Sequence, residues 1–227
     1  MNRIQIYLES APKRTFAGGL DWPGWARSGR TEADALAALA AYAPRYAQVV
    51  GGGAGFVVPT DSSWLEVVEH LSGNATTEFG APGARPTADD GALDADEVER
   101  QLAILDAAWT ALDRAADAAR GATLRKGPRG GGRTLPKILD HVFDAETGYL
   151  SSLGARYRGP NDVGELRRVG REAVMAAARY EPIADPSAVK KRWPPRFFIR
   201  RSAWHILDHA WEIEDRARPA EVEPSRP

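Results

Sequence analysis

Apolar residues recur every three or four positions in four segments of the second half of the chain. Val98, Leu102 and Leu105 form one such stripe, and Ile199 and Ile206 belong to another. This spacing places apolar side chains on one face of an α-helix, so each segment predicts a helix. Because each helix has one face to bury, we expect an up-down four-helix bundle. The expected helices cover about 94–120, 134–153, 162–180 and 197–216.

The first 71 residues have shorter apolar runs separated by glycine and proline, which is typical of mixed α and β structure. Pro23 and Gly24 indicate a turn. Thr31 is a typical N-cap, and acidic residues follow it in the first turn of a helix expected over 31–46. The candidate strands cover 3–9, 13–20, 55–59 and 64–71, of which the last can also be read as a short helix.

Composition changes between Ser72 and Leu93, where glycine, proline, threonine and alanine dominate. Such a stretch predicts a long connector between two domains. Residues 217–227 are rich in proline and charge and predict a flexible tail. The sequence therefore predicts an α+β protein with a small domain at 1–71, a linker at 72–93 and a helical bundle at 94–216.

Charge and composition indicate which partners, location and metal ligands to expect. The 30 basic and 31 acidic residues nearly cancel, so no global field favours nucleic acid or an anionic membrane. No apolar run approaches the ~20 residues that span a bilayer, and the N-terminus lacks the apolar stretch of a secretory signal, so we expect a cytoplasmic protein. The chain has no cysteine, so imidazole or carboxylate would have to hold any metal, and a reacting thiol would come from outside.

Three of the four histidines form a pattern typical of a metal site. His205 and His209 are four residues apart, so they share one face of the last predicted helix. His141 lies near the margin of the apolar face of the second predicted helix, and helix packing can bring it to the same place. Three neutral imidazoles would hold a divalent metal and leave a position for water or substrate, which the metal would acidify. His70, in contrast, is interpreted as a hydrogen-bonded core residue.

Carboxylates at helical spacing from these histidines are candidates for orienting an imidazole N–H or for moving protons. The alternative for each of them is a solvated charge on the helix surface. These candidates are Asp144, Asp208 and Glu212.

Other polar and aromatic residues are interpreted as structural. Three acidic residues, Glu146, Glu214 and Asp215, are expected to be solvated or paired with Arg200, Arg201 and Arg216. The basic segment 125–133 is expected to be a mobile loop, and the glycines at 51–55 a turn. The late tryptophans are expected to close a core or a domain interface, with a substrate mouth as the alternative. They are Trp193, Trp204 and Trp211.

The histidine motifs and the helix order resemble the DinB-like superfamily of bacterial four-helix-bundle metalloproteins. The match covers about 94–216 and rests on DHVFDAETGYL, which holds His141, and on WHILDHAWEIEDR, which holds His205 and His209. The resemblance implies that these histidines ligate a divalent metal, and zinc, nickel and iron are all seen in such folds. Some members act with a low-molecular-weight thiol, among them mycothiol-dependent isomerases and bacillithiol-dependent transferases.

The N-terminal part resembles the HicB-like fold of antitoxin domains. A strand pair within 4–20 is followed by a Pro-Gly turn, a strand, a glycine and a capped helix. The resemblance implies a small βββαβ domain. Antitoxins of that family usually add a DNA-binding domain, whereas this chain continues into helices, so no toxin partner is carried over. An unrelated α+β domain that packs over the bundle is the equal alternative.

Three functions are compatible with these patterns. The first is a cytoplasmic metalloenzyme with a three-histidine site, acting on a small molecule in thiol-dependent transfer or isomerisation, or in hydrolysis. The second is a non-catalytic, metal-stabilised interaction protein, and the third is an antitoxin-like module. Three imidazoles suit zinc, iron, nickel and copper alike, so the sequence does not name the metal. It also leaves a homodimer open.

Overall fold

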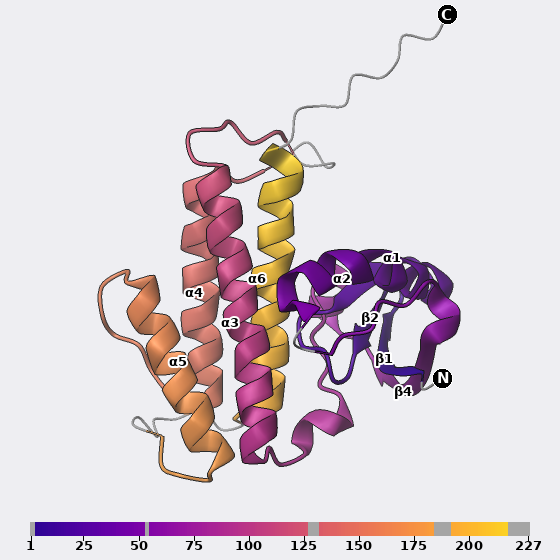
Figure 1. Cartoon of the computed structure of the whole chain (residues 1–227), viewed down its shortest axis with the longest axis horizontal. Coiled ribbons are helices and arrows are strands. Elements are labelled where there is room, and N and C mark those ends of the chain that lie inside the picture. The colour runs from indigo at the N-terminus through magenta and orange to yellow at the C-terminus, as the bar shows by residue number, and fades with distance from the viewer. Residues whose placement is uncertain (1–2, 53–54, 127–131, 184–191, 218–227) are drawn as a thin grey trace, which may run out of the picture.

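The computed structural model describes residues 3–52, 55–126, 132–183 and 192–217. It combines a four-stranded sheet with helices, in agreement with the predicted α+β class. Figure 1 shows the sheet with its helices on one side of the molecule and long helices packed side by side on the other. The expected flexible tail beyond Ala217 lies outside the described residues, and so do parts of the expected basic loop and glycine turn.

The sheet is built from β1 (Ile4–Ala11), β2 (Arg14–Gly19), β3 (Ala26–Gly29) and β4 (Leu65–Ser72). The strand order is β3-β2-β1-β4. β1 pairs antiparallel with β2 across a tight turn, and β2 pairs antiparallel with β3. β4 pairs parallel with β1, which requires a crossover, and the helix between β3 and β4 provides it.

That crossover helix, α1 (Glu32–Val50), begins where the sequence predicted and continues past Pro44. Its N-cap is Thr31, whose side chain accepts a hydrogen bond from a backbone N–H of the first turn at 3.1 Å. α1 packs on the sheet through buried side chains. The indole N–H of Trp25, just before β3, donates to the Leu39 carbonyl at 3.0 Å, which fixes the helix against the strand.

The predicted strand at 55–59 does not form. Phe56 instead packs its ring against Trp22, Trp25 and Tyr46, with centroid distances of 4.8, 5.0 and 5.0 Å. The apolar run therefore serves to anchor one aromatic side chain in a cluster, and it adds no strand to the sheet.

The interpretation of His70 as a core residue is wrong. β4 is an edge strand on which exposed and less exposed residues alternate. Glu66, Val68 and His70 fall on its exposed face. The His70 side chain is 65% exposed, and its Nδ1 lies 3.7 Å from a carboxylate oxygen of Glu32.

The second half of the chain forms the helices that the apolar pattern predicted. Asp94 and Asp162 cap two of them by accepting from backbone N–H groups at 2.8 and 3.0 Å. No helix among the described residues is long and apolar enough to cross a membrane. The helices are α3 (Ala95–Ala118), α4 (Leu135–Leu153), α5 (Val163–Ala178) and α6 (Pro195–Ala217). Of these, α3, α4 and α6 lie side by side, and α5 packs against α4 and α3 (Figure 1).

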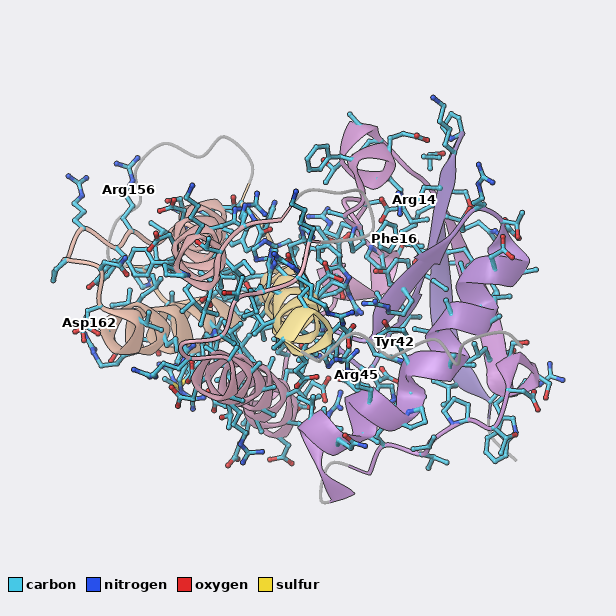
Figure 2. All side chains as sticks on the ribbon, turned by 90° about the horizontal axis from the view of Figure 1, so that it is seen from above. Arg14, Phe16, Tyr42, Arg45, Arg156 and Asp162 are labelled. Carbon is cyan, nitrogen blue, oxygen red and sulfur yellow. The ribbon has the colours of Figure 1, made fainter. Side chains whose placement is uncertain are left out.

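α6 is buried on nearly all sides, whereas the sequence predicted a single apolar face. Its predicted stripe, which includes Ile206, is fully buried where α6 packs against α3 and α4. The opposite side is covered by the N-terminal part, where Phe16 packs edge-on against Trp204 with ring centroids 6.0 Å apart. Figure 2 shows Phe16, Tyr42 and Arg45 on the side of the N-terminal part that faces α6. α6 therefore belongs to the cores of both halves.

Gly24 allows this close approach. Its backbone is in the left-handed region, with φ +89°. A Cβ atom at this position would lie 2.9 Å from a methyl carbon of Leu207 and 3.2 Å from the Cβ of Ala203. Both neighbours are on α6, so the turn predicted at 23–24 packs directly on that helix.

The predicted connector at 72–93 contains short helical elements and packs against its surroundings. It includes α2 (Ala75–Phe79) and a 3-10 turn, η3 (Thr87–Asp90). The buried Thr77 hydroxyl donates to the buried Glu9 carboxylate of β1. A composition-biased stretch gave no sign of these contacts, because they depend on residues far away in the sequence.

A buried ion pair ties η3 to α6. Arg200 donates from Nε and Nη2 to the two carboxylate oxygens of Asp89 at 2.7 and 2.8 Å. The same guanidinium donates to the carbonyls of Gly19 and Leu20 at 2.5 and 2.6 Å. One arginine thus links the connector, the end of β2 and α6.

Candidate metal centre

Three imidazole rings converge between α4 and α6. His141 comes from α4, and His205 and His209 come from successive turns of α6. Their ligand atoms, one from each residue, all lie within 4.8 Å of one another. Nε2 of His205 lies 3.2 Å from Nε2 of His141. The structure therefore brings together the three histidines that the sequence pattern selected.

Helix geometry explains this convergence. The four-residue spacing on α6 places the His205 and His209 rings 4.6 Å apart. Packing of α4 on α6 then brings the His141 ring to 5.1 and 5.0 Å from these two rings. His205 and His209 are each 7% exposed, whereas His141 is half-buried. Solvent thus reaches the cluster from the side of α4.

Burial favours the neutral form of the imidazoles. It is the main cause of the drop of the His205 pKa to about 2, and His209 and Arg201 act in the same direction. Burial also lowers the pKa of His141, with Arg133 as the next cause. Neutral imidazole is the form that coordinates a metal ion, so at neutral pH both rings are in the ligand form.

A carboxylate orients His209. Glu212 Oε2 lies 2.8 Å from Nδ1 of His209, and Glu212 Oε1 accepts from Arg216 Nη1 at 2.6 Å. The hydrogen bond to His209 is the main cause that holds the pKa of Glu212 below its usual range, and Arg216 adds to it. With Nδ1 engaged, Nε2 of His209 is the nitrogen left for coordination. Carboxylate–histidine pairs of this kind commonly support metal ligands.

The nitrogen spacing can be compared with that of a tetrahedral site. Zinc binds imidazole nitrogen at about 2.0–2.1 Å, which puts neighbouring nitrogens roughly 3.3 Å apart. The distance of 3.2 Å between Nε2 of His205 and Nε2 of His141 is close to this value. The ligand atoms of the other two histidine pairs can lie up to 4.8 Å apart. Nδ1 of His205 is buried and has no hydrogen-bond partner. His209 therefore has a support for its ring that His205 lacks.

Aromatic side chains enclose the cluster toward the start of α6. The ring centroid of Tyr149, from α4, lies 5.7 Å from that of His205. Trp193 packs against Tyr149 at 5.4 Å and against Phe197 at 4.9 Å. Trp193 is thus one aromatic layer away from the histidines.

The other two late tryptophans lie at the junction of the two halves, as the interface interpretation expects. Trp204 contacts Phe16 of β2. The Trp211 ring lies 5.4 Å from that of Tyr42 on α1. The Trp204 ring also neighbours that of His205, with ring centroids 6.3 Å apart.

Among the three candidate carboxylates, Glu212 is the one with a hydrogen bond to a described histidine. Asp144 is exposed on α4. Asp208 pairs with Arg27 of β3 at 3.2 Å. A residue three positions after His205 is displaced by about 60° around the helix, which is enough to turn Asp208 toward the N-terminal part. Asp144 is therefore a charge on the helix surface, as the alternative interpretation expected. Asp208 forms an ion pair between the two halves of the chain.

The prediction that Glu146 is solvated or paired with an arginine of α6 is wrong. Its side chain is buried among α3, α4 and α5 and accepts from the indole N–H of Trp109 at 2.5 Å. Burial raises the pKa of Glu146 to about 7. Glu146 lies on the same helix face as Val142 and Leu150, so the spacing contained a signal for burial that its charge obscured.

Glu214 and Asp215 form ion pairs, but their partner is not an arginine of α6. Both pair with Arg45 of α1, at 2.5 and 2.9 Å. This partner follows from the docking of α1 on α6, which sequence spacing along a single helix could not indicate.

Sequence reasoning missed two contributors to the site. Tyr149 follows His141 by two helical turns and therefore lies on the same side of α4, which was a usable signal. Arg216 donates to the carbonyls of Arg125 and Arg133 at 2.7 Å each, besides its bond to Glu212. It thus connects the support of His209 to two points of the segment between α3 and α4, a long-range contact without a sequence signal.

Comparisons with protein-family models, with curated proteins and with solved structures give no match to this chain. The account of its function therefore rests on the geometry of the described residues.

Proposed function

We propose that this chain binds a divalent metal through His141, His205 and His209, and that it is a metalloenzyme. The observation that carries the proposal is the convergence of three ligand atoms from two helices within 4.8 Å. Burial of two of the rings and the lowered pKa values of His141 and His205 favour the neutral ligand form. Zinc, nickel and iron all suit such a donor set.

The surrounding residues have distinct parts in this proposal. The three histidines bind the ion, and Glu212 orients His209. Tyr149 and Trp193 exclude water on the side toward the start of α6. When bound, a divalent ion supplies Lewis acidity, which lowers the pKa of a bound water or thiol. The half-buried His141 side leaves access for a small substrate, so we favour thiol-dependent transfer or isomerisation, or hydrolysis.

The finer fold assignments belong to the same proposal. The order of α3 to α6 is compatible with an up-down four-helix bundle of the DinB-like kind. The order β1, β2, β3, α1 and β4 is compatible with the βββαβ arrangement of HicB-like domains. A cytoplasmic location stays a prediction from the sequence.

Metal analysis tests the proposal. Protein purified without a histidine tag should bind about one equivalent of zinc, nickel or iron in equilibrium dialysis. His205→Ala should lose at least tenfold in affinity. His70→Ala is the matched control, because His70 is exposed on β4, and it should bind like the wild type. A wild-type protein that takes up no metal, or a His205→Ala variant with unchanged affinity, would contradict the proposal.

One observation favours a second function. Both α6 ligands lie on the helix that packs against the two halves of the chain, so a bound metal can also act as a structural clamp. Metallated protein should be assayed with bacillithiol and mycothiol analogues, and without thiol, against the His205→Ala variant. Histidine-dependent turnover supports the enzyme. A metal-dependent rise in the melting temperature without turnover supports the metal-stabilised interaction protein.

A further inference from the structure

Two consecutive arginines of α6 differ in how their charge is compensated. Arg200 is paired with Asp89 and saturated with hydrogen bonds. Arg201 is only 9% exposed, yet its Nη1 is buried without a hydrogen-bond partner. Within the described part of the chain, Arg201 forms no ion pair. Among the described residues, this positive charge therefore has no direct counter-charge.

Two aromatic rings lie beside the guanidinium of Arg201. Cζ of Arg201 lies 5.3 Å from the ring centroid of Tyr149 and 4.8 Å from that of Trp204. Cation–π contacts offset only part of the cost of burying an unpaired guanidinium. An anion bound beside Arg201 would therefore offset the rest of this cost.

A second unpartnered donor lies beside the first. Nε1 of Trp204 is buried and has no acceptor. Trp204 and Arg201 both line a small cavity of about 10 Å³ between α6, the sheet and the connector. Tyr7 of β1 and Pro82 of the connector form part of its opposite wall, and none of the lining residues is acidic.

Two buried carboxylates of this region, Asp89 and Glu9, form no hydrogen bond with Arg201. Asp89 is bound by Arg200. Oε1 of Glu9 accepts from the Thr77 hydroxyl and from the Gly83 N–H, and Oε2 is buried without a hydrogen-bond partner. Neither carboxylate pairs with Arg201, so within the described part of the chain no side chain supplies it with a direct counter-charge.

We propose that this cavity binds a single-atom anion, chloride, held by Nη1 of Arg201 and Nε1 of Trp204. The volume is that of about one water-sized sphere, which is too small for a carboxylate or phosphate group. A water molecule would fit the space but would leave the guanidinium charge uncompensated. Chloride is a single atom that carries the required charge, and it would join α6 to the sheet. The site shares no ligand with the proposed metal centre, although Arg201 and His205 both contact the Tyr149 ring.

Thermal unfolding of the full-length chain tests this site. It should be measured in chelator at constant ionic strength and pH, with sodium gluconate replaced stepwise by sodium chloride. For the wild type we expect a saturable rise of Tm, by about 3–5 °C at chloride tenfold above its Kd, because a ligand that binds only the folded state stabilises it. Arg201→Met should lose this rise, and Trp204→Phe should shift its midpoint to higher chloride.

Arg27→Met is the matched control. Arg27 also lies over aromatic rings, 3.7 Å from the centroid of Tyr42, but it has Asp208 as its counter-charge. This variant should keep the full chloride response. A wild type with the same Tm in both salts, or an Arg201→Met variant with the wild-type response, would overturn the proposal.

A crystal soaked in bromide gives a second test that needs no variant. We expect an anomalous peak within hydrogen-bond distance of Arg201 Nη1 and Trp204 Nε1. A water molecule at that position, without anomalous signal, would overturn the proposal even if chloride stabilised the protein by another route.

Discussion

The buried carboxyl of Glu146 should make the stability of this fold depend on pH. The side chain is enclosed by α3, α4 and α5 and accepts from the indole of Trp109. Its pKa is about 7, against 4.5 for an ordinary glutamate, and burial is the main cause. Glu146→Gln keeps an oxygen that can accept from Trp109 and removes the ionisable proton. This substitution therefore isolates the cost of the buried charge.

The sign follows from the direction of the shift. Below pH 4.5 the carboxyl is protonated in the folded and the unfolded chain, so it makes no difference to stability. Between pH 4.5 and 7 the unfolded chain releases the proton while the folded chain retains it, and the free energy of unfolding falls. The pKa difference of about 2.5 (7 − 4.5) corresponds to about 3 kcal/mol at 1.36 kcal/mol per unit.

Urea unfolding followed by tryptophan fluorescence measures this effect. At pH 8 we expect Glu146→Gln to be about 2–3 kcal/mol more stable than the wild type, and at pH 4.5 the two should be nearly equal. Glu99→Gln, on the exposed side of α3, is the control and should follow the wild-type profile at both pH values. Parallel profiles for Glu146→Gln and the wild type, or a variant less stable at pH 8, would refute the reasoning.

Three further substitutions test other parts of the structure. Asp89→Asn leaves a buried arginine unpaired and should lower the free energy of unfolding by about 3–5 kcal/mol in urea, whereas the exposed Asp90→Asn should cost under about 1 kcal/mol. Equal losses would disprove the ion-pair argument. Gly24→Ala combines a positive φ with a 2.9 Å approach to α6 and should cost about 1–3 kcal/mol in thermal unfolding; an unchanged Tm would show that α6 can move aside. Glu212→Gln should weaken metal binding about 10–100-fold in competition with a chromophoric chelator, and Asp144→Asn should not. The same loss in both variants would point to a general charge effect.

Local signals in the sequence predicted much of the helical half. Apolar spacing placed the helices, whereas the caps that Asp94 and Asp162 provide for two of them were recognised only in the structure. The four-residue spacing of His205 and His209 was enough to place both rings on one side of a helix, because helix geometry is local. Their approach to His141 also needed the packing of α4 on α6, which the apolar stripes made predictable.

Contacts between distant parts of the chain had no such signal. Glu146 is buried because Trp109 and α5 close over it, and its charge alone argued for solvent. His70 is exposed because it falls on the uncovered face of β4, and which face is covered depends on packing between distant parts of the chain. The segment that holds Asp89 looked like a plain linker, because its arginine partner is far away in the sequence. Sequence patterns report local periodicity, and these cases were decided by tertiary packing.

The shared position of α6 has a practical consequence for anyone who wishes to cut this protein. A fragment ending at residue 93 would lose the surface that covers Phe16, and one starting at residue 94 would leave Trp204 and Trp211 in water. Either piece would expose aromatic area that favours aggregation. Partner screens and spectroscopic work should therefore use recombinant protein that carries both segments, since the point where the composition changes is no safe place to divide the gene.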